Sequence, residues 1–464
     1  MSMGKRAREQ QGELWVATGS LATGPGHPFY AKLNEILATE DFDSFVESLC
    51  AEYYQEKKGR PSIPPGVYFR LLMIGYFERI DSERGIAWRC ADSLSLRAFL
   101  GVALDERTPD HSSLSRIRTR LPLEVHEEVF GKILTILGRH KLIRGKTVGV
   151  DATTLEANAA LRSIVRRDTG ESYEDFLKGL AKESGIETPT RQDLAKLDRK
   201  RPKKGSNDDW VNPHDPDAEI TKMKDGSTHL AHKDEHAVDL DTGAVLAVTI
   251  HGGAEGDTSS VTRTLAKVEE NIETVCEDAE AEKHLHEEAP REVVTDKGYH
   301  SNDALVEMHR REYRTYVSEP ERGGRKWEGK AKEQKAVYAN RRRIRGERGK
   351  RLMRKRGELL ERPFAHYLEA GGMRRTHLRE HENILKRLLI HVAGFNLGLL
   401  MRTLFGAGTP KELVELLRGA VFAFWRSWKA PLSLLVWPRA LPATFRLLTT
   451  PRTTRAHASM TAAA

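Results

Sequence analysis

The chain of 464 residues has little of what marks a secreted, disulfide-bonded or membrane protein. Its three cysteines, Cys50, Cys90 and Cys276, lie far apart without a Cys-x-x-Cys pair, so neither a disulfide framework nor a cysteine zinc site is indicated. The N-terminus, MSMGKRAREQQGELW, lacks the apolar core of a secretory signal. The most apolar region, residues 420–435, is interrupted by two basic residues and a proline. It falls short of the roughly 18 to 20 apolar residues of a membrane span, so we expect a cytoplasmic protein without membrane contact.

The chain also lacks a strong overall charge, because 75 Lys and Arg are opposed by 67 Asp and Glu, a surplus of +8. A polyanion responds to local patches more than to the total, so the position of the surplus matters. Residues 321–362 hold seventeen Lys or Arg and only six Asp or Glu. Such a run alone is typical of a solvated basic helix, whereas beside a metal site it suits the phosphate backbone of a nucleic acid.

Residues 1–135 are predicted to form a helical domain, in which the segment TPDHSSLSRIRTRL begins like a helix. Thr108 is expected to cap it, Pro109 suits the first helical position, and Asp110 favours the helix dipole. Apolar residues at helical spacing then share one face.

Three arginines, Arg116, Arg118 and Arg120, occupy the remainder of that helix. Two interpretations stay open. They form either a solvated surface or part of a helix-turn-helix-like unit that lies against DNA phosphates.

A second domain is predicted for residues 136–405, because the hydrophobic period changes there. Residues 146–151 indicate a strand that ends on Asp151, followed by a long polar insertion at about 152–228. Residues 228–253 indicate two strands joined by the hairpin signal Asp241-Thr242-Gly243.

A helix follows at about 258–275, and another buried strand, Glu292–Thr295, ends on Asp296. Strands and helices in this order predict a mixed α/β layer architecture. Residues 406–464 are expected to add a C-terminal helix and a flexible tail.

Asp151 and Asp296 stand in equivalent places, each where a short β-branched strand stops. Open α/β sheets build ligand sites at such positions, and the two carboxylates can meet if their strands are neighbours. Two readings remain: a shared divalent-metal site, or two buried, hydrogen-bonded aspartates. Oxygen-only ligation favours magnesium or manganese over zinc. Neither aspartate has an obvious side-chain cation as its partner.

Several separated segments together resemble the bacterial insertion-sequence transposases of the DDE class. They are GVDATTLEAN, WVNPHDPDAEITKMKDG with the strand pair after it, VVTDKGYHS, and RKRGELLERPFAHYLEAGGMRRTHLREHENILKRLLIHVAGFNLGLLMR. The segment SLRAFLGVALDERTPDHSSLSRIRTRL is similar to the helical domain that precedes the catalytic core in those proteins. The resemblance covers about residues 45–405, with the motifs in the expected order.

The resemblance implies an RNase H-like mixed sheet flanked by helices, preceded by an all-α N-terminal domain. It implies that Asp151, Asp296 and Glu361 bind two magnesium ions, for which manganese can substitute. Glu358 is the rival for the third position, since it lies close to one helical turn earlier. Arg356 corresponds to an arginine ahead of the glutamate, whereas Met353 stands where the family often has tyrosine.

The implied activity is metal-dependent cleavage and strand transfer of DNA. The implied partners are double-stranded DNA, as terminal repeats and target, and further copies of the chain in a homodimer or larger assembly. A bacterial, nucleoid-associated location follows. The predicted DNA contacts are Arg116, Arg118, Arg120, Lys297, Arg341, Arg342, Arg343 and Arg356. A nuclease of the same fold and an inactive DNA-binding descendant of a transposase remain the rival classes.

Overall fold

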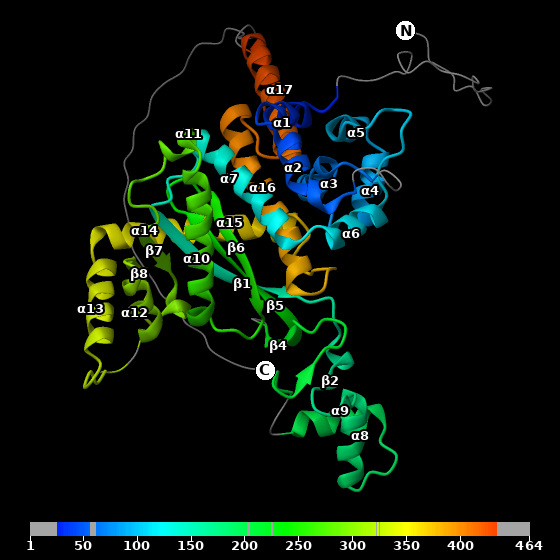
Figure 1. The fold of residues 1–464 in the computed structure, drawn as a ribbon, viewed down its shortest axis with the longest axis vertical. Coiled ribbons are helices and arrows are strands. Elements are labelled where there is room, and N and C mark those ends of the chain that lie inside the picture. The colour runs from blue at the N-terminus through cyan, green and yellow to red at the C-terminus, as the bar shows by residue number, and fades with distance from the viewer. Residues whose placement is uncertain are drawn as a thin grey trace, which may run out of the picture. The chain divides into compact units, whose positions relative to one another are not determined.

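The computed structural model describes residues 26–55, 62–201, 205–223, 226–321, 323 and 325–433, with side chains described through residue 422. It divides the chain into two units, the first ending at Leu413 and the second beginning at Val414. The predictions for the N-terminal residues and for the tail after residue 433 lie outside the described residues. The predicted mixed α/β architecture with N-terminal helices is confirmed (Figure 1).

The regular elements of the N-terminal region, within its described residues, are all helices. Its elements are α1 (Pro28–Thr39), α2 (Phe42–Cys50), η2 (Ala51–Tyr53), α3 (Pro65–Phe77), α4 (Glu83–Ala91), α5 (Leu94–Leu100), α6 (His111–Arg120) and α7 (Leu123–Arg139). Their buried aromatic and aliphatic side chains belong to the same hydrophobic core cluster as those of the sheet. The helices and the sheet are therefore packed on one continuous core.

The helix α6 begins later than its sequence predicts. Its N-cap is Asp110, whose carboxylate accepts a hydrogen bond from the Ser112 N–H at 2.9 Å, so the prediction of Thr108 as the cap was wrong. An aspartate in extended conformation is a strong acceptor for these orphan N–H groups, and it caps the helix directly. The predicted apolar face is confirmed, since Leu114 and Ile117 are buried.

The central sheet has six strands, in the order β4-β5-β1-β7-β8, with β6 paired to the other part of β5. Their bounds are β1 (Thr147–Glu156), β4 (Glu219–Lys222), β5 (Thr228–Asp239), β6 (Val245–Gly252), β7 (Glu292–Thr295) and β8 (Arg314–Val317). β1 is antiparallel to β5 and parallel to β7, and β7 is parallel to β8. The predicted hairpin is confirmed, with Gly243 at φ +84° in its turn.

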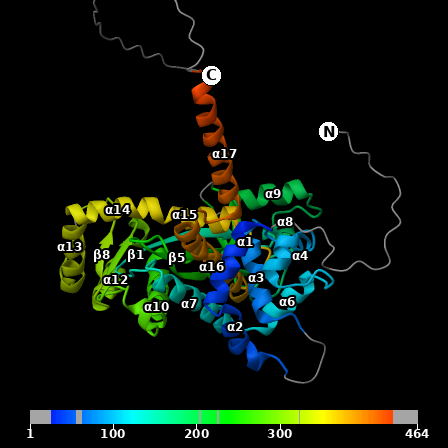
Figure 2. The same cartoon turned by 90° about the horizontal axis from the view of Figure 1, so that it is seen from above.

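Helices cover both faces of this sheet. Figure 2 shows α14 and α15 along one side of the strands and α10 on the opposite side. The remaining elements of this region are α10 (Asp257–Cys276), α11 (Ala279–Glu282), η4 (Lys297–Tyr299), α12 (Asn302–Arg310), α13 (Ala331–Arg345), α14 (Glu347–Leu359), α15 (Glu361–Phe364) and η5 (Ala365–Ala370). The break between α14 and α15 has a local cause: Pro363 has no N–H to bond the carbonyl of Leu359 four residues earlier.

The predicted insertion forms a small lobe, which we call the insertion lobe, residues 161–211. It contains η3 (Leu161–Ser163), α8 (Tyr173–Glu183), α9 (Arg191–Lys200) and the pair β2 (Val165–Arg166) and β3 (Trp210–Val211). Trp210 is buried in a hydrophobic cluster that also contains Ile164 of the lobe and Leu230 of β5. The lobe is therefore packed against the end of the sheet, and a smaller cluster of Leu177, Ala181 and Leu194 lies within it.

Helix α16 (His381–Phe405) is the core helix of the first unit, packed against α3, α7 and β6. Asn396 fixes it to the sheet by accepting from the Val245 N–H at 3.0 Å and donating to the Val245 carbonyl at 2.8 Å. The stretch His381–Phe422 is long and apolar enough to cross a membrane by length and composition, but most of its apolar window is buried in protein, as in any core helix. Helix α17 (Pro410–Ser433) continues into the second unit.

Candidate functional site

Asp151 lies inside a strand rather than at its end. β1 continues to Glu156, because β5 pairs with it along the whole length, from Val148 opposite Asp239 to Glu156 opposite Ala231. The predicted strand end, and with it the predicted start of the insertion at residue 152, was therefore wrong. The Asp151 side chain is 24% exposed. The continuous ladder with β5 fixes its backbone.

Asp296 directly follows β7, as predicted. In the parallel pairing of β1 and β7, Gly149 lies opposite Val294. Each aspartate is two residues beyond its member of this pair. The ladder between the two strands ends at that pair, and Asp296 is the first residue after β7. The register therefore brings the two predicted acids to neighbouring positions of the chain, about one strand spacing of 4.8 Å apart where the ladder ends.

Asp151 has a cationic neighbour that the sequence analysis did not predict. A terminal nitrogen of Arg356, on α14, lies 3.7 Å from a carboxylate oxygen of Asp151. The sequence offered no obvious cation for Asp151, and the structure supplies Arg356. The two residues are 205 positions apart in the sequence, and the ion pair forms because α14, which packs on β7 and β8, brings Arg356 to Asp151 on the neighbouring strand β1. At 3.7 Å the contact is an ion pair without a hydrogen bond.

Two contacts place the beginning of α15 over the strand that carries Asp151. A Cβ on Gly149 would lie 2.5 Å from a methyl carbon of Leu360, so the helix junction rests directly on β1. The ring of Phe364 stacks on that of His236 with centroids 3.7 Å apart, and His236 is the β5 partner of Asp151. Leu360 and Phe364 thus pack on β1 and β5 next to Asp151, and Glu361 lies between them in the sequence.

The rival Glu358 is placed differently. Its side chain is 70% exposed and is paired with Arg362 at 3.9 Å, one helical turn along. Glu361 is also exposed, but it is on the turn that contacts β1. The arrangement favours Glu361 over Glu358 as the acid nearest to Asp151.

The donor set fits a hard cation in part. Asp151 and Asp296 offer carboxylate oxygens on adjacent strands, which suits magnesium or manganese. Within the described residues, however, no three His, Cys, Asp or Glu side chains converge as metal ligands. Asp151, Asp296 and the third acid therefore all stay predicted metal ligands.

The arginines predicted to contact DNA on α6 are not equivalent. Arg118 is paired with Glu83 and its side chain is only 14% exposed. Arg116 is exposed and donates to the Ser112 carbonyl at 3.1 Å, one turn back. Arg120 is exposed and lies over the Tyr54 ring at 4.9 Å. Arg116 and Arg120 present their charge outward, whereas Arg118 has a buried internal partner.

The arginines of the basic segment, residues 321–362, also differ in whether they are bonded within the chain or exposed. Arg341 makes two hydrogen bonds to Glu319, at 2.6 and 2.7 Å. Arg343 donates to the backbone and side chain of Thr315, both at 2.9 Å, and burial lowers its pKa. Arg342 is exposed between them. Much of the positive charge that the sequence assigned to DNA is therefore used to fix α13 to β8.

Lys297 is exposed beside Asp296, at the start of the turn η4. Its position next to the paired aspartates agrees with the predicted contact to a DNA strand. No observation tests that contact, so it stays a prediction.

Sequence reasoning missed a buried polar network next to these acids. Glu235, on β5, is fully buried and accepts hydrogen bonds from Ser260 at 2.7 Å, from Tyr299 at 2.9 Å and from Thr264. Burial raises the pKa of Glu235, and its hydrogen bonds and Lys233 oppose that rise. The one available signal was the alternation of β5 itself, THLAHKDEHAVD, in which charged residues occupy both faces of a strand too long for an edge.

A second buried pair lies on the opposite face of β5. The Tyr367 hydroxyl donates to Asp234 at 2.9 Å, and both residues are fully buried. Burial raises the pKa of Asp234 to about 7. Tyr367 is on η5, six residues after Glu361.

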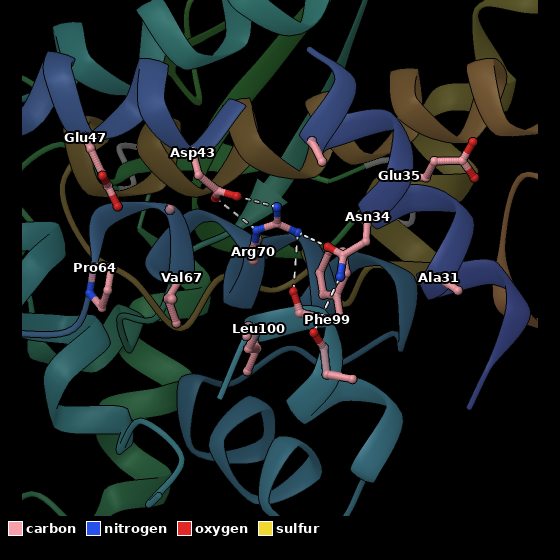
Figure 3. Close-up of a pocket in the computed structure, with 14 residues that line it drawn as sticks. Ala31, Asn34, Glu35, Asp43, Glu47, Pro64, Val67, Arg70, Phe99 and Leu100 are labelled. Carbon is pink, nitrogen blue, oxygen red and sulfur yellow. Dashed lines mark hydrogen bonds and ion pairs between the residues drawn. The ribbon is translucent and has the colours of Figure 1, made fainter. Parts of the chain in front are cut away.

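A large cavity is lined by residues of the N-terminal helices and by neither Asp151 nor Asp296. It measures about 660 Å³ and lies among α1, α2, α3 and α5 (Figure 3). Arg70 reaches into it and donates to both carboxylate oxygens of Asp43, at 3.1 and 2.7 Å, and to the Phe99 carbonyl at 3.3 Å. Asn34 also accepts from this guanidinium. Arg70 is thus held by the helices around it.

Comparison with known families gives a match in the helical region. Residues 20–120 match the family model of a transposase domain (DUF772), which covers the described helices α1 to α6. The class of protein that this domain defines is a DNA-processing enzyme. Within that class the match supports a transposase. Neither a curated protein nor a solved structure matches the chain.

Proposed function

We propose that this chain is a transposase of the DDE class, with an RNase H-like catalytic domain that cleaves DNA and transfers the cleaved strand. The observation that carries the proposal is the β1–β7 register, in which Gly149 lies opposite Val294, two residues before Asp151 and Asp296 respectively. The transposase domain at residues 20–120 supports the same conclusion independently. Glu361 is the proposed third acid, because α15 lies against β1 and β5 around Asp151.

The paired carboxylates would hold magnesium, which when bound supplies an activated water, charge shielding at the phosphate and stabilisation of the leaving oxygen. In the proposed cycle, water attacks the phosphodiester at the transposon end and breaks its P–O bond to leave a 3′-hydroxyl. That hydroxyl then attacks a phosphodiester of the target DNA and forms a new P–O bond, while the P–O bond to the target strand's own 3′-oxygen breaks and that oxygen leaves as a hydroxyl. The exposed Lys297, Arg342, Arg116 and Arg120 are placed to hold the phosphate backbone.

Arg356 has a specific role in this proposal. Its ion pair neutralises part of the Asp151 charge, which eases the burial of two carboxylates at one level of the sheet. A DNA phosphate offers Arg356 a second anion, so the residue can bridge Asp151 and the substrate backbone.

A strand-transfer assay with the element's own end sequences, cloned from the DNA that flanks the gene, tests the proposal. Wild type is run with and without magnesium beside Asp151→Asn, Asp296→Asn, Glu361→Gln and, as a matched control, Glu358→Gln. We expect joining to fall at least about 1000-fold in the first three, equivalent to about 4 kcal/mol of transition-state stabilisation. The control is expected to stay within about 2-fold, since Glu358 faces solvent and Arg362.

Each rival class has its own signature in this assay. Cleavage of DNA without transfer of a precut 3′-hydroxyl end indicates a nuclease. Binding of the ends without any cleavage by wild type indicates an inactive DNA-binding protein. Joining that survives the loss of Asp151 or Asp296 refutes the proposed site.

A further inference from the structure

The two aspartates are held very differently by the backbone. Asp151 lies inside β1, where it is paired with His236 of β5, while the ladder with β7 on the other side ends two residues earlier, at Gly149. Asp296 follows the last residue of β7 and begins the short turn η4, where its carboxylate accepts from the Gly298 N–H at 2.8 Å. The sheet alone therefore does not fix Asp296, and the position of its carboxylate depends on what holds the turn.

A buried hydrogen bond is the first contact that fixes the turn η4. Tyr299 ends η4, is 1% exposed, and donates its hydroxyl to Glu235 at 2.9 Å. Glu235 is itself fixed on β5, where it lies opposite Ala152, the residue after Asp151. The bond thus connects the Asp296 turn to the strand that pairs with the Asp151 strand.

A second hold passes through a lysine. Lys233 lies two residues before Glu235 on the same face of β5, with only 6% of its side chain exposed. Its amine is 3.7 Å from Glu235 and 2.6 Å from Asp257, the first residue of α10. Asp257 in turn rests on the turn, since a Cβ on Gly298 would lie 2.5 Å from its carboxylate oxygen and 3.0 Å from that of Asp296.

We propose that Glu235 is a positioning residue that fixes Asp296 relative to Asp151, through Tyr299 on one side and through Lys233 and Asp257 on the other. The inference rests on the proposed function, because it assigns Asp296 to the metal site. The network contains no group that must touch DNA. Its role is to hold one carboxylate at the level of its neighbour. Outer-shell partners of this kind typically change metal affinity or activity by about 10–100-fold when they are removed.

The experiment measures Mn²⁺ binding by the full-length protein with electron paramagnetic resonance, in the absence of DNA. Tyr299→Phe removes only the hydroxyl that grips the turn, and we expect the Kd for Mn²⁺ to rise about 10-fold. Tyr316→Phe is the matched control. Tyr316 is buried on β8 and donates to Glu292 at 3.3 Å, so its loss also removes a tyrosine–glutamate hydrogen bond, but at the other end of β7. We expect its Kd to equal that of wild type.

A merely structural role of Tyr299 predicts another result. The two variants would then lower the thermal midpoint by similar amounts and share one Mn²⁺ affinity, and that outcome overturns the positioning role. It would leave the proposed function standing if wild-type binding still depends on Asp151. Wild-type protein that shows no Mn²⁺ binding dependent on Asp151 refutes the metal site itself, and the positioning role falls with it.

Discussion

Each face of β5 carries a buried carboxylate that accepts a hydrogen bond from a tyrosine hydroxyl, but the surroundings of the two carboxylates differ. On one face Tyr299 donates to Glu235, and on the other Tyr367 donates to Asp234, in both cases at 2.9 Å. Glu235 has further donors and a lysine beside it. Asp234 has one oxygen without a hydrogen-bond partner in the described part of the chain.

The difference shows that a carboxylate can be fully buried without having hydrogen-bond donors for both of its oxygens. Burial raises the pKa of both carboxylates, but in Glu235 several donors and Lys233 oppose the rise, and breaking this network leaves those donors unsatisfied. Burial raises the pKa of Asp234 to about 7, because a single hydrogen bond, from the Tyr367 hydroxyl, opposes it there and Glu235 adds to it. Glu235 is therefore suited to rigid support, whereas Asp234 responds to pH near neutrality.

The largest expected effect comes from neutralising each acid without changing its shape. At pH 8, Glu235→Gln is expected to lower the free energy of unfolding by about 3 kcal/mol, because the amide places a donor against the hydroxyls that now donate to it and removes the charge beside Lys233. Asp234→Asn is expected to change it little or to raise it. Urea unfolding monitored by circular dichroism measures both. Equal losses would show that the two faces do not differ.

A smaller effect is expected in the pH dependence of the free energy of unfolding, to which Asp234 contributes. Asp234 titrates near pH 4 in the unfolded chain and at about 7 when folded, so between these values the folded state holds a proton that the unfolded state has lost. Its contribution to stability is complete below about pH 4 and is lost as the pH rises through 7. We expect wild type to lose about 2 kcal/mol relative to Asp234→Asn between pH 5 and pH 7. Parallel pH dependence of the two proteins would contradict the raised pKa.

The smallest effect is expected from Tyr367→Phe, which removes the one hydroxyl that donates to Asp234. The loss is about 1 kcal/mol at pH 8, the usual cost of one hydrogen bond. It is expected to shrink at pH 5, where Asp234 is neutral in the folded state. A shift of the urea midpoint at constant slope measures it, and a cost that does not change with pH would argue against coupling to the Asp234 charge.

The larger elements were predictable because their signals are local. The hairpin at Asp241-Thr242-Gly243 and the buried strand Glu292–Thr295 both formed where the pattern placed them. The cap of α6 and the end of β1 were predicted wrongly. The first depends on which of two neighbouring side chains reaches the free N–H groups, and the second on the length of a partner strand far along the chain.

The two aspartates of the site were predictable from the sequence, but the residues that contact them and hold them in place were not. Asp151 and Asp296 stood out because each follows a β-branched run. The ion pair of Arg356 with Asp151 and the hold of Tyr299 on Glu235 join residues more than 60 positions apart. Such contacts have no periodic signal, and charged residues of β5 that a pattern assigns to the surface become buried only when α10 and η5 cover the two faces.

The parallel register of β1 and β7 limits the changes of length that this chain tolerates. Because side chains alternate between the faces of a strand, one residue inserted between Thr147 and Asp151 moves the carboxylate to the opposite face of the sheet. A residue inserted beside Gly170, in a turn of the insertion lobe with open space around it, disturbs no alternation. Descendants of this gene are therefore free to vary in length in the lobe, while the spacing within the two strands is constrained by geometry.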